Sequence, residues 1–112
     1  MKTVLFLCLA VLWGANVRLH AADARENYER MCALCHGEDG KGKTKMGEKS
    51  GAKDLTDRKL QEGVKDAEMM KAIKEGVKDK ETGKFRMVAF GETLSEEEVK
   101  ALVAYVRAFK PK

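Results

Sequence analysis

Cys32-Ala33-Leu34-Cys35-His36 is the stretch of sequence that decides the fold of this chain. On a helical turn, residues three and four apart fall on one face, so Cys32, Cys35 and His36 can approach the same flat ligand. The two sulfurs can each bond to a vinyl group at the edge of a porphyrin, while the imidazole reaches the iron. This spacing is typical of c-type haem attachment. We therefore predict one covalently attached haem c at Cys32 and Cys35, with His36 as an iron ligand.

A Cys-x-x-Cys pair can also arise in three ways that involve no haem. A dithiol redox motif is expected in a βαβ context, and this sequence shows no convincing strands. Half of a zinc site is a second possibility, but structural zinc is almost always four-coordinate, and only three candidate ligands lie together here. The other cysteine and histidine, Cys8 and His20, fall in a segment that we expect to be removed. Chance occurrence of the motif is the third alternative.

The N-terminal segment has the three-part layout of an export signal. Lys2 gives a positive start, residues 4–13 are an unbroken apolar run, and small residues including Ala22 and Ala24 follow. The run is too short for a transmembrane helix, which needs roughly 20 apolar residues. We predict a signal peptide over residues 1–22, with cleavage after Ala22 or Ala24, and a periplasmic location. An uncleaved membrane anchor is the alternative.

Residues 23–112 would then form one small domain of 90 residues. Small domains bury proportionally little surface, and the only two cysteines left in this one belong to the motif. No disulfide can therefore stabilise the domain, whereas a bound cofactor at its centre would explain how it holds a core. Without the signal, 20 basic and 18 acidic residues remain, and this near balance gives no indication of nucleic-acid binding.

The first half of the domain shows one clear helical pattern. Apolar residues at helical spacing predict a helix from about Asp23 into the motif, and Gly37 is a natural stop. Residues 37–51 are rich in glycine and lysine without an apolar period, which predicts a loop with a tight turn at 40–42. A short helical turn is expected at about residues 58–62.

The second half predicts two further helices. Asp66 is expected to cap the first of them, which ends before Gly76, and a polar loop over residues 77–85 follows. Ser95 with Glu98 forms a capping box for the last helix. That helix carries an apolar stripe of Val99, Leu102, Val103, Val106 and Phe109. With no repeats and no convincing strands, the fold class is predicted to be all-α.

An electron-transfer haem with six ligands needs a partner opposite the histidine, commonly a methionine thioether. The candidates after the signal are Met31, Met46, Met69, Met70 and Met87. The first two lie too close to the motif, and the next two fall inside a predicted helix, where core packing is the simpler role. Met87 lies in an irregular segment 51 residues after His36, which leaves enough chain to cross the haem. We predict His36 and Met87 as axial ligands; a core methionine at a loop–helix junction is the alternative for Met87.

These motifs together resemble class I cytochromes c of the small bacterial monohaem type, over essentially the whole domain. The Cys-x-x-Cys-His motif matches, and Met87-Val88-Ala89-Phe90-Gly91 with the helix after it is similar to the family's methionine-ligand loop and final helix. The resemblance implies a small cytochrome c fold, with helices wrapped around one haem and with the N- and C-terminal helices crossing. Ala24 and Tyr28 would then meet Leu102 and Tyr105.

The sequence departs from this family at two places. Val88 stands where a proline usually follows the ligand methionine, and proline would fix φ there. The family also often has a proline near the carbonyl that accepts the second N–H of the histidine, a bond that orients the ring. The only proline of this chain is Pro111, so no acceptor for His36 can be named from the sequence.

The resemblance implies a soluble, exported carrier of single electrons between redox proteins, with no substrate chemistry of its own. We expect a monomer without stable membrane insertion. The lysines that follow the motif are predicted to frame a haem edge where an acidic partner docks: Lys41, Lys43, Lys45, Lys49 and Lys53. A merely solvated surface is the alternative for these lysines. A haem enzyme or gas-binding protein with an open iron position, and an accessory subunit of a larger complex, are the alternatives for the function.

Overall fold

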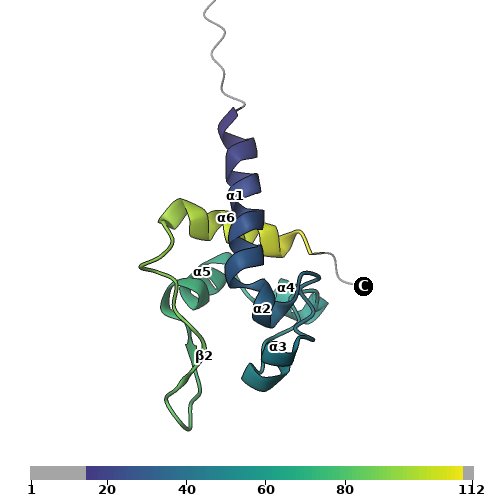
Figure 1. Cartoon of the computed structure of the whole chain (residues 1–112), viewed down its shortest axis with the longest axis vertical. Helices are drawn as coiled ribbons and strands as arrows, with labels where there is room; N and C mark the ends of the chain where they lie inside the picture. The colour runs from purple at the N-terminus through teal and green to yellow at the C-terminus, as the bar shows by residue number, and fades with distance from the viewer. Residues whose placement is uncertain (1–14, 110–112) are drawn as a thin grey trace, which may run out of the picture.

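A computed structural model describes residues 15–109 of the chain, and its fold is mostly helical (Figure 1). Its elements are α1 (Ala15–Met31), α2 (Ala33–His36), α3 (Lys45–Ser50), α4 (Arg58–Gly63), α5 (Asp66–Glu75), β1 (Val77–Lys78), β2 (Phe85–Met87) and α6 (Glu96–Arg107). The predicted all-α class is confirmed, with one small antiparallel hairpin, β1–β2, added to it.

The first and last helices cross, as Figure 1 shows, and pack through aromatic rings. The ring centroids of Tyr28 and Tyr105 are 4.9 Å apart, and Phe109 joins them with its centroid 5.4 Å from that of Tyr28. Ala24, Tyr28 and Leu102 are buried. The predicted contact between these two helices is therefore confirmed.

The hydrophobic core lies where α5 and the segment before α6 meet the crossing. Its buried side chains are Tyr28, Met69, Ile73, Leu94, Val99, Leu102 and Val103. The α6 members recur three and four residues apart, which places them on one face of the helix. Met69 is 8 % exposed, so its predicted role as a core residue is confirmed.

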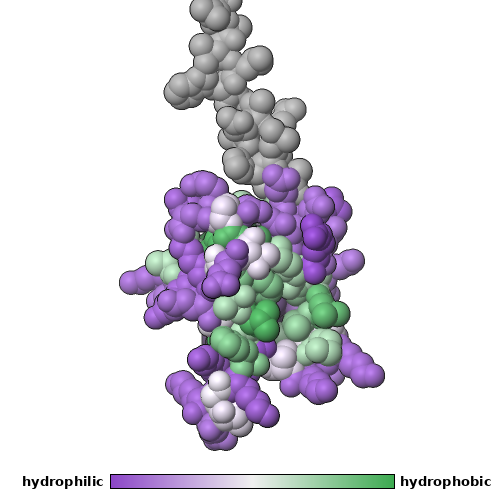
Figure 2. Space-filling model, turned by 60° about the vertical axis from the view of Figure 1, so that its left-hand side comes forward, coloured by the Kyte–Doolittle hydropathy of each residue, from purple (hydrophilic) through white to green (hydrophobic). Residues whose placement is uncertain are grey.

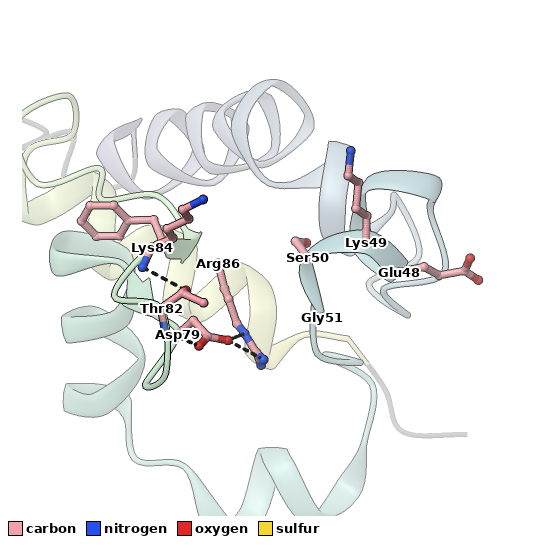
Figure 3. A pocket seen from close by; sticks show the side chains of 9 residues that line it. Glu48, Lys49, Ser50, Gly51, Asp79, Thr82, Lys84 and Arg86 are labelled. Atoms are coloured by element: carbon pink, nitrogen blue, oxygen red, sulfur yellow. Dashed lines mark hydrogen bonds and ion pairs between the residues drawn. The ribbon is translucent and has the colours of Figure 1, made fainter.

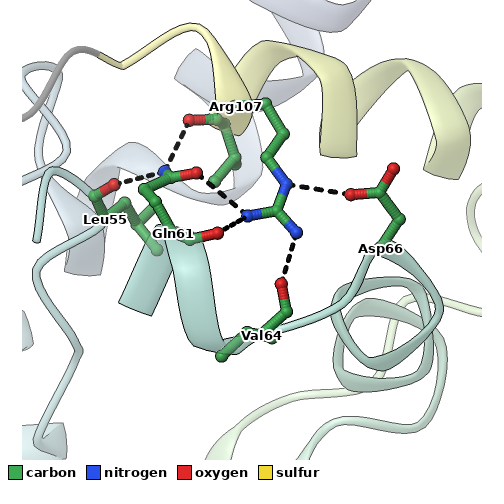
Figure 4. A network of polar contacts seen from close by, with 6 residues as sticks. Leu55, Gln61, Val64, Asp66 and Arg107 are labelled. Atoms are coloured by element: carbon green, nitrogen blue, oxygen red, sulfur yellow. Dashed lines mark hydrogen bonds and ion pairs between the residues drawn. The ribbon is translucent and has the colours of Figure 1, made fainter. Parts of the chain in front are cut away.

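One arginine near the end of α6 fastens the chain between α4 and α5 (Figure 4). Arg107 donates from Nε to Asp66, 2.8 Å away, and from its two terminal nitrogens to the backbone carbonyls of Gln61 and Val64. Gln61 in turn donates to the carbonyls of Leu55 and Val106. This network joins segments that are more than 40 residues apart in sequence.

Three local predictions were wrong. The predicted loop after Gly37 contains α3, because Thr44 accepts a hydrogen bond from Gly47 N and caps a turn that carries no apolar pattern. The cap of α5 is Lys65, and Asp66 is its first residue, whose carboxylate instead pairs with Arg107. The predicted loop over residues 77–85 is the β1–β2 hairpin, whose strands are too short to show alternation.

The predicted export signal lies mostly outside the residues that the structure describes. Its apolar run at residues 4–13 is not covered, and the predicted cleavage position after Ala22 or Ala24 falls within α1. The helix begins at Ala15, earlier than the expected start near Asp23. None of the helices within residues 15–109 has the length and apolarity needed to cross a membrane.

Candidate haem site

The Cys-x-x-Cys-His motif folds as a single helical turn at the end of α1. Cys35 N and His36 N both donate to the carbonyl of Cys32, at 3.2 and 2.9 Å, so the two thiols and the imidazole are carried by one rigid turn. The turn ends at Gly37, which has a φ of 81° that favours glycine. Cys32 and Cys35 are free thiols, both partly buried.

Tyr28 holds this turn from inside the core. Its hydroxyl donates a 2.6 Å hydrogen bond to the carbonyl of Gly37, the residue that ends the motif. The side chain is fully buried, so the bond is shielded from water. The helical spacing of Tyr28 indicated packing, but nothing in the sequence pointed to the acceptor of its hydroxyl.

Thr44 fastens α3 against the motif. Its hydroxyl lies 2.7 Å from the carbonyl of Leu34 and 2.9 Å from that of Cys35 and also accepts from Gly47 N. Gly47 packs so closely on the motif that a Cβ at this position would lie 2.1 Å from the carbonyl oxygen of Cys35. Only glycine permits this approach, which makes α3 a support for the motif.

His36 is oriented by the acceptor that could not be named from the sequence. Its Nδ1 lies 3.0 Å from the carbonyl oxygen of Lys53. A carbonyl can only accept, so Nδ1 carries the proton and Nε2 presents its lone pair. Burial, opposed by this hydrogen bond, lowers the pKa of His36. A neutral imidazole with Nε2 available is the form that binds a metal.

Cys32 lacks the lowered pKa of a redox-active thiol. Burial, followed by the proximity of Cys35, raises the pKa of Cys32 to about 11. Dithiol oxidoreductases instead depend on a thiolate stabilised by a lowered pKa. No cluster of three or more His, Cys, Asp or Glu side chains able to hold a metal ion occurs in the described part of the chain.

Met87 lies at the end of the hairpin, on a different part of the fold from the motif. It is the last residue of β2, opposite Val77, and is partly buried against the core. The chain after it is held to the end of α5, because Phe90 N donates to the carbonyl of Ile73 and Gly91 N to that of Lys74. Met46, by contrast, is 44 % exposed on α3.

An open cleft of about 440 Å³ separates α3 from the hairpin (Figure 3). One wall is the C-terminal end of α3 with its cap, residues 48–51. The other is formed by five residues of the hairpin: Asp79, Thr82, Lys84, Phe85 and Arg86. The large exposed apolar side chains come from the motif, from α3 and from the hairpin and the residue after it: Leu34, Met46, Val77, Phe85 and Val88. Figure 2 shows apolar surface gathered below the helix crossing, with a hydrophilic border.

These features fit a covalently held porphyrin. Two thiols and a neutral imidazole lie on one turn, the predicted second ligand lies on the hairpin, and apolar surface is exposed on the elements around the cleft. Contiguous apolar surface of this kind marks a binding site. The lysines after the motif are not all in one place, however. Lys41 and Lys43 line a second cleft, beside Arg58 and Asp54, whereas Lys49 lines the first.

Comparison with known proteins agrees with this site. Residues 20–106 match the family model described as cytochrome c oxidase, cbb3-type, subunit III. The solved structure of the KustC0563 c-type cytochrome is 39 % identical, with a TM-score of 0.69 over 79 % of this chain and 98 % of that one. A mutant of that cytochrome gives 38 % identity and a TM-score of 0.67, over 79 % of this chain and 99 % of that one.

A more distant structure shares the fold alone. It is the reducing HAO-like protein complex Kustc0457/Kustc0458 of Kuenenia stuttgartiensis, at 22 % identity and a TM-score of 0.58, over 79 % of this chain and 41 % of that one. No curated protein matches the chain significantly. The family match covers the motif, α3, the hairpin and most of α6. The chain therefore belongs to the cytochrome c family described as cytochrome c oxidase, cbb3-type, subunit III, whose members bind haem c covalently.

Proposed function

We propose that this protein is an exported monohaem cytochrome that carries single electrons between redox partners. Cys32 and Cys35 would hold the haem through thioether bonds, and His36 and Met87 would be the axial ligands of its iron. The bound haem supplies a reversible one-electron couple, while the protein contributes binding, orientation and the exclusion of water. The chain itself carries out no substrate chemistry.

The observation that carries this proposal is the hydrogen bond from His36 Nδ1 to the carbonyl of Lys53, 3.0 Å long. It fixes the ring orientation and the tautomer, and such bonds to a metal-binding histidine raise its strength as a ligand. Met87 supports an iron whose two axial positions are both filled by protein side chains, because Met87 is partly buried and the segment after it is hydrogen-bonded to α5. An iron with two protein ligands transfers electrons and leaves no position for a substrate.

The proposed location and partners rest on different features. An export signal over residues 1–22 is supported by the layout of the sequence and by a family match that begins at residue 20. Lys41, Lys43 and Arg58 line one cleft together with Asp54 and Asp57, and the excess of positive charge there is offered to an acidic redox partner. We propose a monomer that meets such partners transiently.

The first experiment asks whether haem is covalently held and whether Met87 binds it. Haem should stay on the polypeptide after denaturation in acid and organic solvent. Met87→Ala should lower the reduction potential, remove the weak far-red band of ferric methionine-ligated haem, and let carbon monoxide bind the reduced iron. These changes follow because a thioether favours ferrous iron and occupies the sixth position.

Met69→Ala is the matched control. Because Met69 is 8 % exposed in the core, its truncation should cost about 2–5 kcal/mol of stability and leave the spectrum unchanged. If Met69→Ala loses the far-red band and Met87→Ala keeps it, the wrong sulfur has been assigned. Ready binding of carbon monoxide to the unmodified protein would instead favour a haem enzyme or gas-binding protein.

A further inference from the structure

The backbone beside Met87 lies in close contact with the C-terminal end of α5, from which the hairpin extends (Figure 1). Gly76 caps α5 and immediately precedes Val77, the β1 residue that pairs with Met87. A Cβ on Gly76 would lie 2.5 Å from the carbonyl oxygen of Met87 and 2.9 Å from the amide nitrogen of Ala89. No side chain fits in this space, so the peptide groups on both sides of Val88 rest directly on the end of α5.

A second close approach follows Met87 along the chain, at Gly91. Its N–H donates to the carbonyl of Lys74, 3.0 Å away, and a Cβ on Gly91 would lie 2.8 Å from that same oxygen. The N–H of Phe90 donates to the carbonyl of Ile73, a buried core residue, at 2.9 Å. Both acceptors belong to the last turn of α5, whose carbonyls need partners from outside the helix. The segment from Met87 to Gly91 is therefore tied to α5 at both of its ends.

Val88 gives this segment no backbone restraint of its own. Its side chain is 57 % exposed, and its N–H makes no hydrogen bond with any residue between 15 and 109. Valine leaves φ free to vary, whereas a proline at this position would fix φ at about −65°. The placement of Met87 therefore depends on how its neighbours pack, and that packing is closest at Gly76.

We propose that Gly76 and Gly91 are positioning residues for Met87, which keep its sulfur on the haem iron and so keep the sixth position closed to external ligands. This inference rests on the proposed covalent haem and on Met87 as its second ligand. Contact of backbone with backbone resists displacement, because neither side has a flexible side chain that could give way. The simpler possibility is that the two glycines only shape the entry into the hairpin. Replacing them would then lower stability without opening the iron.

The test uses the ferric holoprotein and measures the rate at which imidazole replaces the methionine, followed through the loss of the far-red band. Gly76→Ala should raise this rate at saturating imidazole by about tenfold or more, because the new Cβ forces the backbone of Met87 away from α5. Amide hydrogen exchange gives a readout that does not depend on the iron. The N–H groups of Phe90 and Gly91 should exchange faster in the same variant, since both are bonded to α5.

Gly83→Ala is the matched control. Gly83 lies in the turn of the same hairpin and has a φ of 70°, against 74° for Gly76, but nothing lies within 4 Å of a Cβ there. Both substitutions therefore place alanine in the left-handed region, and only Gly76→Ala adds a contact. Gly83→Ala should keep the imidazole rate within about twofold of the unmodified protein.

Two further variants decide the matter if Gly76→Ala does not fold. Gly91→Ala adds a Cβ against the carbonyl of Lys74 at a residue whose φ is not positive, and it should also raise the imidazole rate. Val88→Pro should slow the reaction again in the Gly91→Ala background and change it little in the unmodified protein. Proline costs no hydrogen bond there, and the extended backbone of Met87 is the form that proline favours before it.

The outcomes separate this inference from the proposed function. Imidazole rates in Gly76→Ala and Gly91→Ala that equal the rate of the unmodified protein overturn the inference and leave the electron-carrier proposal intact. Strong slowing by Val88→Pro alone overturns it too, because the end of α5 would then leave the segment loose. An unmodified ferric protein that lacks the far-red band would instead overturn Met87 as the ligand.

Discussion

The imidazole of His36 and the backbone carbonyl of Lys53 are joined by a 3.0 Å hydrogen bond that closes the segment between them. The same segment is fastened at two other points, where Gly42 N donates to the carbonyl of His36 and Ala52 N to that of Gly47. The orientation of the proposed iron ligand therefore depends on how closely α3 packs against the motif. Because the acceptor is backbone, changing the Lys53 side chain should leave this bond in place.

Gly47→Ala should destabilise the protein strongly. Its new Cβ would lie 2.1 Å from the carbonyl oxygen of Cys35, and backbone cannot move aside as a flexible side chain can. Overpacking of this kind costs about 1–3 kcal/mol or more. Urea unfolding of the holoprotein measures the loss. Gly63→Ala is the control, because nothing lies within 4 Å of a Cβ there, and its stability should stay equal or rise. Equal losses in the two variants would contradict the proposed close packing of α3.

Tyr28→Phe should lower stability by about 0.5–1.5 kcal/mol, because the buried carbonyl of Gly37 loses one of its two donors and keeps only Gly40 N. Thermal and urea unfolding of the holoprotein would both report this. Tyr105→Phe is matched to it, since Tyr105 packs on the same ring cluster but its hydroxyl makes no hydrogen bond within residues 15–109. It should change stability by less than about 0.5 kcal/mol. If Tyr28→Phe leaves the stability unchanged, the hydroxyl of Tyr28 does not support the motif.

The capping box of α6 should make stability depend on pH in the acid range. Hydrogen bonds from the backbone N–H of Ser95 and the Asn27 side chain lower the pKa of Glu98 below its usual value. A carboxyl whose pKa is lower in the folded state than in the unfolded state stabilises the fold at pH values above its unfolded-state pKa. That stabilisation is lost as the pH falls through its folded-state pKa. Glu98→Gln should therefore lower stability at neutral pH, with the difference from the unmodified protein vanishing in acid.

Two variants check the capping box independently. Ser95→Ala should cost about 1 kcal/mol, because the N-cap hydroxyl accepts from Glu98 N. Glu97→Gln removes a neighbouring carboxylate that forms an exposed ion pair with Lys100, 3.7 Å long. This change should have little effect on stability at neutral pH. Chemical unfolding of each variant at several pH values gives the comparison. A Glu98→Gln difference that persists unchanged into acid would exclude the proposed role of the carboxylate.

Reversing the charges of Lys41 and Lys43 to Glu should slow the reaction with an anionic oxidant such as hexacyanoferrate. Both lysines line the cleft beside Arg58, and exposed charges steer encounters over about 8–10 Å at near-physiological salt. The effect should shrink as salt rises and reverse with a cationic oxidant. Lys71→Glu with Lys100→Glu carries the same charge change on α5 and α6 and should slow the reaction less. Equal slowing by both pairs would indicate net charge rather than a docking surface. Stopped-flow kinetics measures the rates.

The sequence by itself determined the features whose physical basis is local. The spacing of Cys32, Cys35 and His36 places them on one turn whatever surrounds it, and the pair Ser95 and Glu98 defines the start of α6. The crossing of α1 with α6 also followed from the sequence, through the family resemblance and the apolar stripe that α6 carries. A missed element such as α3 shows the limit, because its cap by Thr44 accompanies no apolar period.

Only the tertiary structure decided which groups support the motif. The acceptor for His36 is a backbone carbonyl, which every residue has, so no side-chain pattern could single out Lys53. Tyr28 reaches Gly37, and Arg86 reaches toward Gly51, through contacts between segments whose approach no local spacing encodes. Such contacts depend on how the elements pack around a shared core. The identity of the motif is therefore a property of the sequence, and its orientation is a property of the fold.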